Sequence, residues 1–241
     1  MKFYLPFKRC IDIILSALGL ILLIPIFLPV MIILRFTGER EVFYLQERMG
    51  LNNKMFYIYK FATMVKDSPN LGSKTLTLRN DPRVTKVGKI LRLTKINELP
   101  QILNVLKGEM SLVGPRPLIV RSFYKYTPEI QKIIYKNKPG ITGIGSLVFR
   151  DEEKLVSLYK ELHPEIDSMD YYQQYIYPYK GQLEQWYFKN VSFWVDMKIL
   201  FLTFYSIVNS RNELVYKWFK SLPQKPEILT VEGIRKTANN N

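Results

Sequence analysis

The residues best able to do chemistry in this sequence stand together at Asn97 and Glu98, just ahead of Pro100. Asn is a favoured N-cap residue, Pro is tolerated in a first helical turn, and Gly108 can end a helix. We therefore predict one helix from about Glu98 to Lys107. A helix N-terminus offers unpaired N–H groups and partial positive charge, which favour phosphate. An N-cap Asn and a first-turn Glu would equally stabilise a helix that binds no phosphate, so this alternative stays open.

A single arginine, Arg116, follows this helix between two prolines. Rigid flanks reduce the entropy lost when a guanidinium binds phosphate through a forked, charge-assisted contact. A rigid connecting turn with a solvated arginine would show the same pattern. The residues alone therefore leave phosphate binding and a simple turn as equal alternatives.

Two further segments, one rich in glycine and one acidic, contain no specific motif. The glycine-rich turn from Lys138 to Ser146 matches neither a Walker loop nor a dinucleotide-binding fingerprint, and it could be only a connection. The run from Asp151 to Glu153 is acidic enough for a metal ion. An Asp cap followed by first-turn glutamates explains that run more simply.

Composition limits the kinds of chemistry that remain. The 241 residues make one ordinary domain, or one domain with an appendage. One cysteine, Cys10, and one histidine, His163, exclude a disulfide framework, a Cys/His zinc site and a triad that needs a second imidazole. The chain has 35 Lys and Arg against 21 Asp and Glu, a net charge of +14, which predicts an anionic partner.

A membrane segment is predicted near the N-terminus, because 22 residues from Ile13 to Leu34 carry no charge. As a helix this stretch would cover roughly 33 Å, about the thickness of a bilayer core. Pro25 predicts a kink within it, and basic residues flank both of its ends. We favour a bent hairpin that enters and leaves one leaflet, with a tilted, kinked span as the alternative.

Beyond Glu41 the chain is predicted to be globular, with a basic surface beside the membrane segment. Short strands at residues 42–44 and 55–59 would form a hairpin around the turn at residues 50–53. Residues 54–95 hold ten Lys and Arg and only two acids, which predicts a basic surface for phosphate or lipid head groups. The apolar, aromatic stretch from Val191 to Val208 is interpreted as an interfacial helix, with a core helix as the alternative.

In sum, these residues resemble the bacterial sugar transferase family, the monotopic polyprenyl-phosphate phosphoglycosyl transferases. The resemblance covers nearly the whole chain. The matching positions are Lys8-Arg9, Asp12, Gln46, Arg48, Gly50, Phe56, Lys60-Phe61, Thr63-Met64, Asp81 to Gly88, Arg92, Glu98 to Gln101, Asn104 to Gly108, Met110 to Pro117, Lys138 to Gly143, Ser192 to Trp194 and Asp196. So many matches in order make chance similarity an inadequate explanation.

The resemblance implies a mixed, helix-rich α/β monotopic membrane protein. Residues 1–40 would form a re-entrant membrane helix-hairpin, residues 41–180 a small cytoplasmic catalytic domain, and residues 181–241 interfacial amphipathic helices and a polar tail. The expected location is the cytoplasmic face of the bacterial inner membrane. An anionic lipid membrane is therefore an expected partner, a homodimer is left open, and nucleic acid is not expected because no nucleic-acid-binding motif is present.

The family's activity is the transfer of a sugar-1-phosphate from a UDP-sugar to polyprenyl (undecaprenyl) phosphate, with release of UMP and a requirement for Mg²⁺. This is the first membrane step in the assembly of exopolysaccharide, capsule, O-antigen or glycoprotein glycans. By position, the resemblance implies that Glu98 binds the metal and Arg116 holds a donor phosphate. Arg92 and Lys60 would line the same pocket.

One departure concerns the catalytic pair, Asn97 and Glu98. In characterised relatives an Asp precedes the Glu and attacks the donor, whereas an amide cannot act as that nucleophile. Three explanations remain: an engineered Asp→Asn variant, a natural branch in which the acceptor attacks directly and Asn97 positions it, or an inactive relative that only binds. Ile24 and Ala62 also depart from the family's usual Ser and Arg. Three departures together favour a natural branch.

Overall fold

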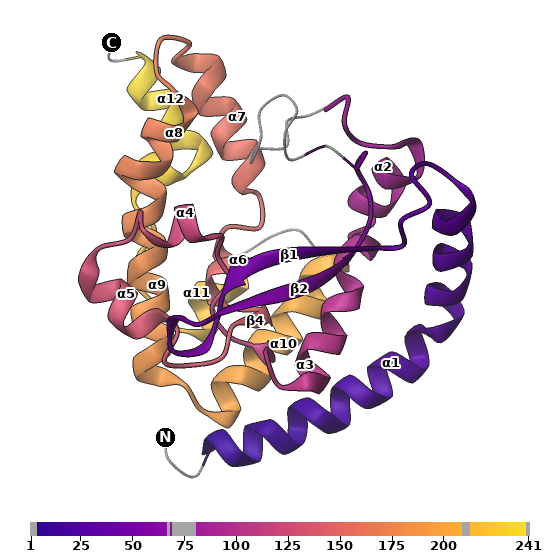
Figure 1. Ribbon diagram of the computed structural model, residues 1–241. Coiled ribbons are helices and arrows are strands. Elements are labelled where there is room, and N and C mark those ends of the chain that lie inside the picture. The colour runs from indigo at the N-terminus through magenta and orange to yellow at the C-terminus, as the bar shows by residue number, and fades with distance from the viewer. Residues whose placement is uncertain (1–3, 67, 69–80, 209–212, 240–241) are drawn as a thin grey trace. The chain divides into compact units, whose positions relative to one another are not determined.

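The computed structural model describes residues 4–66, 68, 81–208 and 213–239 (Figure 1). The chain divides into two compact units, which are described separately. Unit 1 comprises residues 1–8, 49–54 and 110–241, and unit 2 comprises residues 9–48 and 55–109. The described residues form a helix-rich mixture with two small sheets. The sequence predicts the helix-rich α/β class and one of the two sheets, the hairpin. The functional division at residues 40 and 180 stays a prediction.

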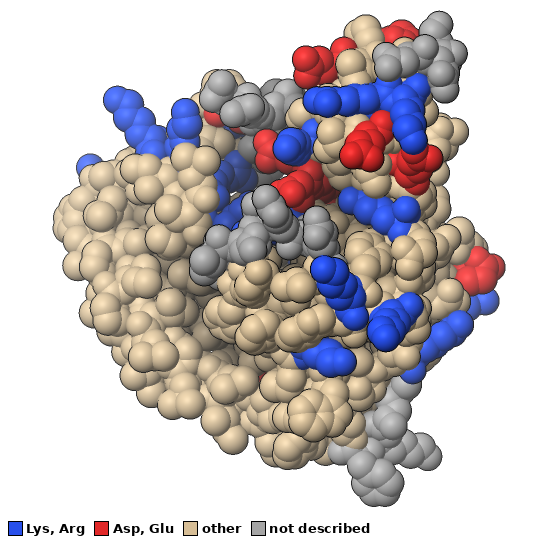
Figure 2. Space-filling model, turned by 180° about the vertical axis from the view of Figure 1, so that it is seen from behind, with Lys and Arg blue, Asp and Glu red and all other residues tan. Residues whose placement is uncertain are grey.

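The N-terminal apolar segment forms a single helix, α1 (Tyr4–Phe36), of 33 residues. Among the described helices, α1 is the one long and apolar enough to cross a membrane, and only 17% of its most apolar window is buried. Leu22 is 76% exposed and Phe36 81% exposed, so α1 is not a core helix. Figure 2 shows a broad surface free of charged side chains over α1, on the left of the view. These exposed apolar side chains indicate membrane association.

Helix α1 continues through Pro25 and Pro29 without interruption. Its ribbon is visibly bent in Figure 1, as internal prolines lead one to expect because each removes a backbone donor. The kink at Pro25 itself, and the choice between a re-entrant hairpin and a tilted span, stay predictions.

In unit 2, strands β1 (Phe43–Met49) and β2 (Met55–Phe61) pair in a two-stranded sheet. A 3₁₀ turn joins them, in which Asn52 and Asn53 have φ values of 54° and 58°. Asn tolerates this left-handed conformation better than most residues. The predicted hairpin is confirmed, with both strands longer than predicted.

Helix α2 (Lys86–Leu93) packs closely against the chain that follows β2. A Cβ on Gly88 would lie 2.1 Å from the backbone oxygen of Thr63, so only glycine fits there. Thr85 caps the helix by accepting a 3.0 Å hydrogen bond from the Gly88 N–H. Phe61 and Leu91 then join Phe27 of α1 in a shared apolar core.

Unit 1 is built on a short parallel sheet of β3 (Ser111–Val113) and β4 (Gly140–Thr142). A Cβ on Gly140 would lie 2.1 Å from the nitrogen of Gly114, and a Cβ on Gly143 would lie 2.1 Å from its oxygen. The glycines therefore serve close backbone packing, and the segment predicted as a turn forms strand β4 rather than a simple connection.

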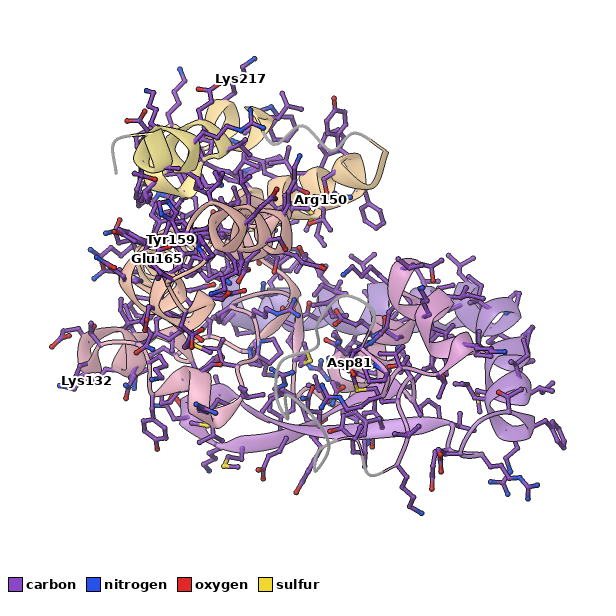
Figure 3. The ribbon with its side chains drawn as sticks, turned by 90° about the horizontal axis from the view of Figure 1, so that it is seen from above. Asp81, Lys132, Arg150, Tyr159, Glu165 and Lys217 are labelled. Carbon is purple, nitrogen blue, oxygen red and sulfur yellow. The ribbon has the colours of Figure 1, made fainter. Side chains whose placement is uncertain are left out.

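Helices cover this sheet and form most of unit 1. Their bounds are α4 Val120–Phe123, α5 Pro128–Ile134, α6 Ile144–Val148, α7 Glu152–Leu162, α8 Ser168–Tyr171, α9 Tyr177–Asn190, α10 Phe193–Val208, α11 Glu213–Trp218 and α12 Val231–Asn239, with a π-helical turn at Tyr172–Ile176 and a 3₁₀ turn at Glu227–Leu229. Aromatic rings fill much of the core between them. Tyr159, labelled in Figure 3, stacks on Tyr171 with ring centroids 4.0 Å apart.

Helix α10 has one buried side and one exposed aromatic side. Ile199 and Leu202 are buried in the core of unit 1, whereas Trp194 and Phe204 are 71% and 70% exposed. The helix is therefore neither fully a core helix nor fully on the surface. Its position at the membrane interface stays a prediction.

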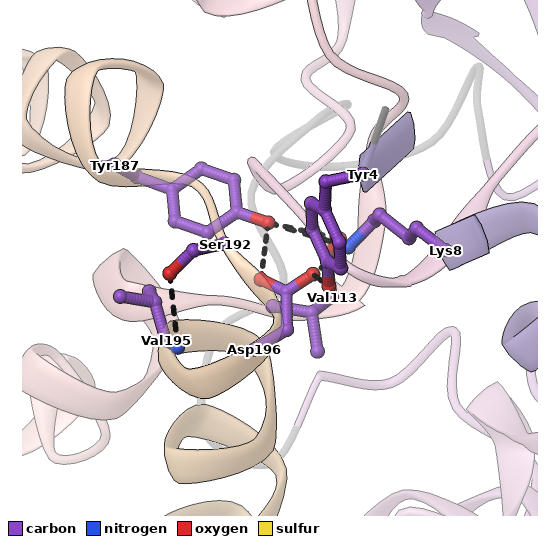
Figure 4. A network of polar contacts seen from close by, with 7 residues as sticks. All are labelled: Tyr4, Lys8, Val113, Tyr187, Ser192, Val195 and Asp196. Atoms are coloured by element: carbon purple, nitrogen blue, oxygen red, sulfur yellow. Dashed lines mark hydrogen bonds and ion pairs between the residues drawn. The ribbon is translucent and has the colours of Figure 1, made fainter. Parts of the chain in front are cut away.

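A buried polar network fixes the start of α1 to α10 (Figure 4). Asp196 forms an ion pair with Lys8 and accepts hydrogen bonds from Tyr4 Oη at 2.6 Å and from Tyr187 Oη at 2.8 Å. Lys8 also donates to the backbone oxygen of Val113 at 2.8 Å. Because both charges are paired and hydrogen-bonded, their burial is tolerated.

Candidate active site

The predicted catalytic pair lies in a 3₁₀ segment, Ile96–Gln101, that leads directly into the short helix α3 (Ile102–Lys107). Both β2, which carries Lys60, and α2, which carries Arg92, pack against this segment. Three separate parts of unit 2 therefore bring their side chains to one place.

Asn97 is not the N-cap of a helix, so this part of the prediction is wrong. Lys95 occupies the cap position in a left-handed conformation with φ of 60°, and its oxygen accepts the Glu98 N–H at 3.1 Å. The chain then winds as a tight 3₁₀ turn through Pro100, and the α-helical part starts only at Ile102. The left-handed residue therefore starts the turn early and places Asn97 inside it.

The amide of Asn97 is the least satisfied polar group of this site. The residue is only 7% exposed, and its Oδ1 atom has no hydrogen-bond partner among the described residues. Burying an amide oxygen without a donor costs free energy, about 1–3 kcal/mol. Such unsatisfied groups are rare and indicate a site that is completed by something else.

Glu98 forms an ion pair with one cation and lies within electrostatic reach of a second. Its Oε1 is 3.5 Å from Lys60 Nζ, and the two side chains are 34% and 16% exposed. Burial lowers the pKa of Arg92, while the negative charges of Asp81 and Glu98 raise it. That Lys60 and Arg92 line one phosphate pocket stays a prediction.

Asp81, labelled in Figure 3, forms a bidentate ion pair with the guanidinium of Arg83. Arg83 Nε donates to Asp81 Oδ1 at 2.9 Å, and Nη2 donates to Oδ2 at 2.6 Å. A third donor, Nη1, reaches the backbone oxygen of Ser68 at 2.9 Å. This paired arrangement fixes the loop before α2, and so the start of the helix that carries Arg92.

The far end of the site is anchored to α1 and β2. Arg9 donates from Nη1 and Nη2 to the oxygens of Val105 and Leu106 at 2.5 and 2.7 Å, which satisfies the C-terminal carbonyls of α3. Asn104 accepts the Tyr59 N–H at 3.0 Å and donates to the Tyr57 oxygen at 2.7 Å. Arg9 and Asn104 are among the positions that resemble the family, but the sequence alone predicts no role for them.

Arg116 belongs to unit 1 and is exposed. Its backbone oxygen accepts a 2.8 Å hydrogen bond from Tyr135 Oη, which itself accepts the Leu118 N–H at 2.8 Å. Tyr135 is 1% exposed. The turn around Arg116 is therefore fixed by a buried tyrosine as well as by its two prolines.

The acidic run before α7 is a helix start, as the simpler interpretation predicts. Asp151 occupies the N-cap position, although its side chain makes no capping hydrogen bond, and two glutamates follow in the first turn. Glu152 pairs with Lys180 at 2.6 Å. Among the described residues, no three His, Cys, Asp or Glu side chains gather as a metal cage.

Comparison with known proteins identifies the class. The sequence profile described as bacterial sugar transferase matches residues 3–210, and the chain belongs to that family. The class is thus one of transferases, and the exposed apolar helix α1 and the carboxylate of Glu98 paired with Lys60 agree with it.

Three relatives illustrate the similarity. The UDP-glucose:undecaprenyl-phosphate glucose-1-phosphate transferase of Klebsiella pneumoniae is 37% identical over 199 residues, covering 82% of this chain and 39% of that protein. The undecaprenyl-phosphate galactose phosphotransferase of Salmonella typhimurium is 33% identical, covering 81% and 39%. An Aeromonas hydrophila protein named for N-acetylgalactosamine phosphate transfer to undecaprenyl phosphate is 33% identical, covering 85% and 44%. The chain therefore spans about two fifths of the length of these relatives.

Proposed function

We propose that this protein transfers a sugar-1-phosphate from a UDP-sugar to undecaprenyl phosphate and releases UMP, at the cytoplasmic face of the bacterial inner membrane. The observation that carries the proposal is the ion pair of Glu98 with Lys60, within electrostatic reach of Arg92 and next in sequence to the buried amide of Asn97. The exposed apolar α1 supports a lipid-linked acceptor. The reaction would open the assembly of a bacterial glycan.

The two cations explain how anionic substrates would be held. A diphosphate donor and a phosphate acceptor repel each other, and Lys60 and Arg92 would offset that repulsion. Arg116, on its rigid turn, would hold a donor phosphate through its forked N–H groups. The rigidity of this turn limits the conformational entropy that Arg116 loses when it binds phosphate.

The donor set fits Mg²⁺ shared with the substrate. Mg²⁺ prefers oxygen ligands and is commonly bound by one or two carboxylates plus waters and substrate phosphates. Glu98 supplies one carboxylate, and the unpartnered Oδ1 of Asn97 supplies a neutral oxygen close by in sequence. When bound, Mg²⁺ would neutralise charge on the phosphates.

Direct attack by the acceptor is the mechanism that suits Asn97. An oxygen of undecaprenyl phosphate would attack the donor's β-phosphorus, and the bond from that phosphorus to the bridging oxygen would break. UMP would leave with the electron pair. Asn97 would help to position the substrates rather than attack, because an amide supplies no nucleophile.

Purified protein in nanodiscs tests the proposal when it is incubated with undecaprenyl phosphate, Mg²⁺ and a panel of UDP-sugars. At least one donor is expected to give UMP only when the lipid acceptor is present. A folded sample that releases no UMP with any donor would contradict the proposal.

The alternative is a catalytically impaired relative that binds without turnover, and Asn97 is the specific observation that favours it. The variant Asn97→Asp separates the two cases, with Asn190→Asp at the exposed end of α9 as a charge-matched control. Activity in the unsubstituted protein supports the transferase. Activity that arises only in Asn97→Asp supports the impaired relative.

A further inference from the structure

Glu184, on α9, is a buried carboxylate that the proposed reaction does not use. The residue is only 7% exposed. Its Oε1 lies 2.9 Å from the point that a Cβ on Gly145 would occupy. The glycine of α6 thus leaves room for this side chain. Burying a carboxylate is costly, and buried carboxylates are retained mainly where they have a partner, a ligand or a function.

One helical turn earlier on α9, Lys180 connects Glu184 to the start of α7. Lys180 Nζ lies 2.6 Å from Glu152 Oε2, and the two side chains are 19% and 22% exposed. The same Nζ stands 5.0 Å from the ring centre of Phe149, and Lys225 Nζ stands 5.4 Å from it. Two acids, two ammonium groups and an aromatic ring therefore form one partly accessible cluster within unit 1.

Arg116 belongs to the same unit as this cluster. Burial lowers the pKa of Lys180 and the carboxylate of Glu152 raises it, while the charge of Arg116 lowers it further. The Arg116 guanidinium is thus within electrostatic reach of Lys180. A ligand held at Arg116 would have the cluster within the same unit.

The composition of the cluster suits hydroxyl groups rather than a second phosphate. Glu152 and Glu184 accept hydrogen bonds and would repel an anion, whereas sugar hydroxyls can donate to them. Lys180 can donate to a hydroxyl oxygen, and an aromatic ring such as Phe149 offers an apolar surface for C–H groups. Acids and bases stand together in this cluster, so an uncharged polyol is the matching ligand.

The geometry points to Glu184, with Lys180 and Glu152, as the subsite that binds the hydroxyl groups of the sugar carried by the donor. This assignment rests on the proposed function, in which Arg116 holds the phosphate attached to that sugar. Ribose of the nucleotide also carries neighbouring hydroxyls, so the experiment must separate the two sources.

The experiment compares the binding of UMP, UDP and a panel of UDP-sugars to Glu184→Gln and to the exposed control Glu161→Gln of α7. Affinity for the best UDP-sugar is expected to fall about 10-fold in Glu184→Gln, because a hydrogen bond from a sugar hydroxyl to the carboxyl group is lost. UDP affinity should stay unchanged, and the control should match the unsubstituted protein. An equal loss for UDP would assign the cluster to ribose and overturn the proposal, as would no loss at all.

Gly145→Ala is the second variant, since its Cβ would displace the Glu184 carboxylate without changing any charge. It should reduce UDP-sugar affinity and leave UDP affinity unchanged in a sample whose unfolding temperature shows an intact fold. If both variants still release UMP and keep the sugar selectivity of the unsubstituted protein, the subsite assignment is overturned. Absence of UMP release with every donor would instead refute the transferase, and the binding measurements would still decide the subsite.

Discussion

Lys60 Nζ lies 3.5 Å from Glu98 Oε1, and this contact joins β2 to the 3₁₀ segment of the site. A second pair in the same unit, Lys66 and Glu41, has the same 3.5 Å separation but side chains that are 72% and 52% exposed. The first pair is 16% and 34% exposed, so solvent screens it less. The two pairs form a matched test of whether the site pair serves the reaction.

Lys60→Met is expected to lower UMP release about 100-fold, since it removes a cation aimed at substrate phosphate. Lys66→Met should leave the rate unchanged, because that pair is exposed and outside the site. Steady-state rates with saturating lipid acceptor measure both. Equal rates in the two variants would show that Lys60 has no part in the reaction.

Asp196→Asn is expected to destabilise the protein by about 3–5 kcal/mol, because it leaves Lys8 buried without its counter-ion. The substitution also weakens the hydrogen bonds from Tyr4 and Tyr187. Thermal unfolding in detergent measures the change, with Asp170→Asn on the exposed surface of α8 as the control. An unfolding temperature equal to that of the control would contradict this account of the network.

Glu184 is expected to make stability depend on pH. Burial raises its pKa from 4.5 to about 7, while the charge of Lys180 opposes this. The other titratable groups within its electrostatic reach are Tyr126, before α5, and Tyr187 of α9, and Gly145 of α6 adds no charge.

Between pH 4.5 and about 7 the folded protein keeps a proton that the unfolded chain releases, so stability falls as pH rises through this window. The loss amounts to roughly 3 kcal/mol and is complete above the folded pKa. Glu184→Gln lacks this loss and should gain stability relative to the unsubstituted protein as pH increases. Unfolding curves from pH 4 to pH 8 that run parallel in the two proteins would refute the prediction.

The exposed side of α10 is expected to face lipid. Trp194 is 71% exposed, whereas Trp186 of α9 is 8% exposed in the core. Indole rings favour the membrane interface, so brominated lipids should quench Trp194 fluorescence strongly. Variants that retain only Trp194 or only Trp186 make the comparison, and equal quenching in both would place α10 away from the bilayer.

The sequence predicts the elements better than it predicts the local geometry of the site. The charge-free stretch before Leu34 marks α1, and the strand pattern marks the β1–β2 hairpin, because both depend on local apolar patterning. The left-handed Lys95 carries no such signal, since lysine rarely adopts that conformation. The cap at Asn97 was predicted from local preference and is overridden by this turn.

Long-range partners explain the rest of what could not be predicted. Lys60 and Arg92 are assigned to one pocket by family resemblance, and their electrostatic connection to Glu98 depends on the packing of β2 and α2 against the 3₁₀ segment. Glu184 sits in a helix without an amphipathic pattern, and only the tertiary contact with Gly145 distinguishes it. Pairing across such distances leaves no trace in the local pattern of one sequence.

The most direct test of the transferase uses a UDP-sugar radiolabelled at the β-phosphate, in nanodiscs that contain undecaprenyl phosphate and Mg²⁺. The account predicts that the label passes into the lipid extract in step with UMP release, with no label on the protein when the acceptor is omitted. Label that stays in the donor with every UDP-sugar, or that appears as water-soluble sugar phosphate, would contradict it.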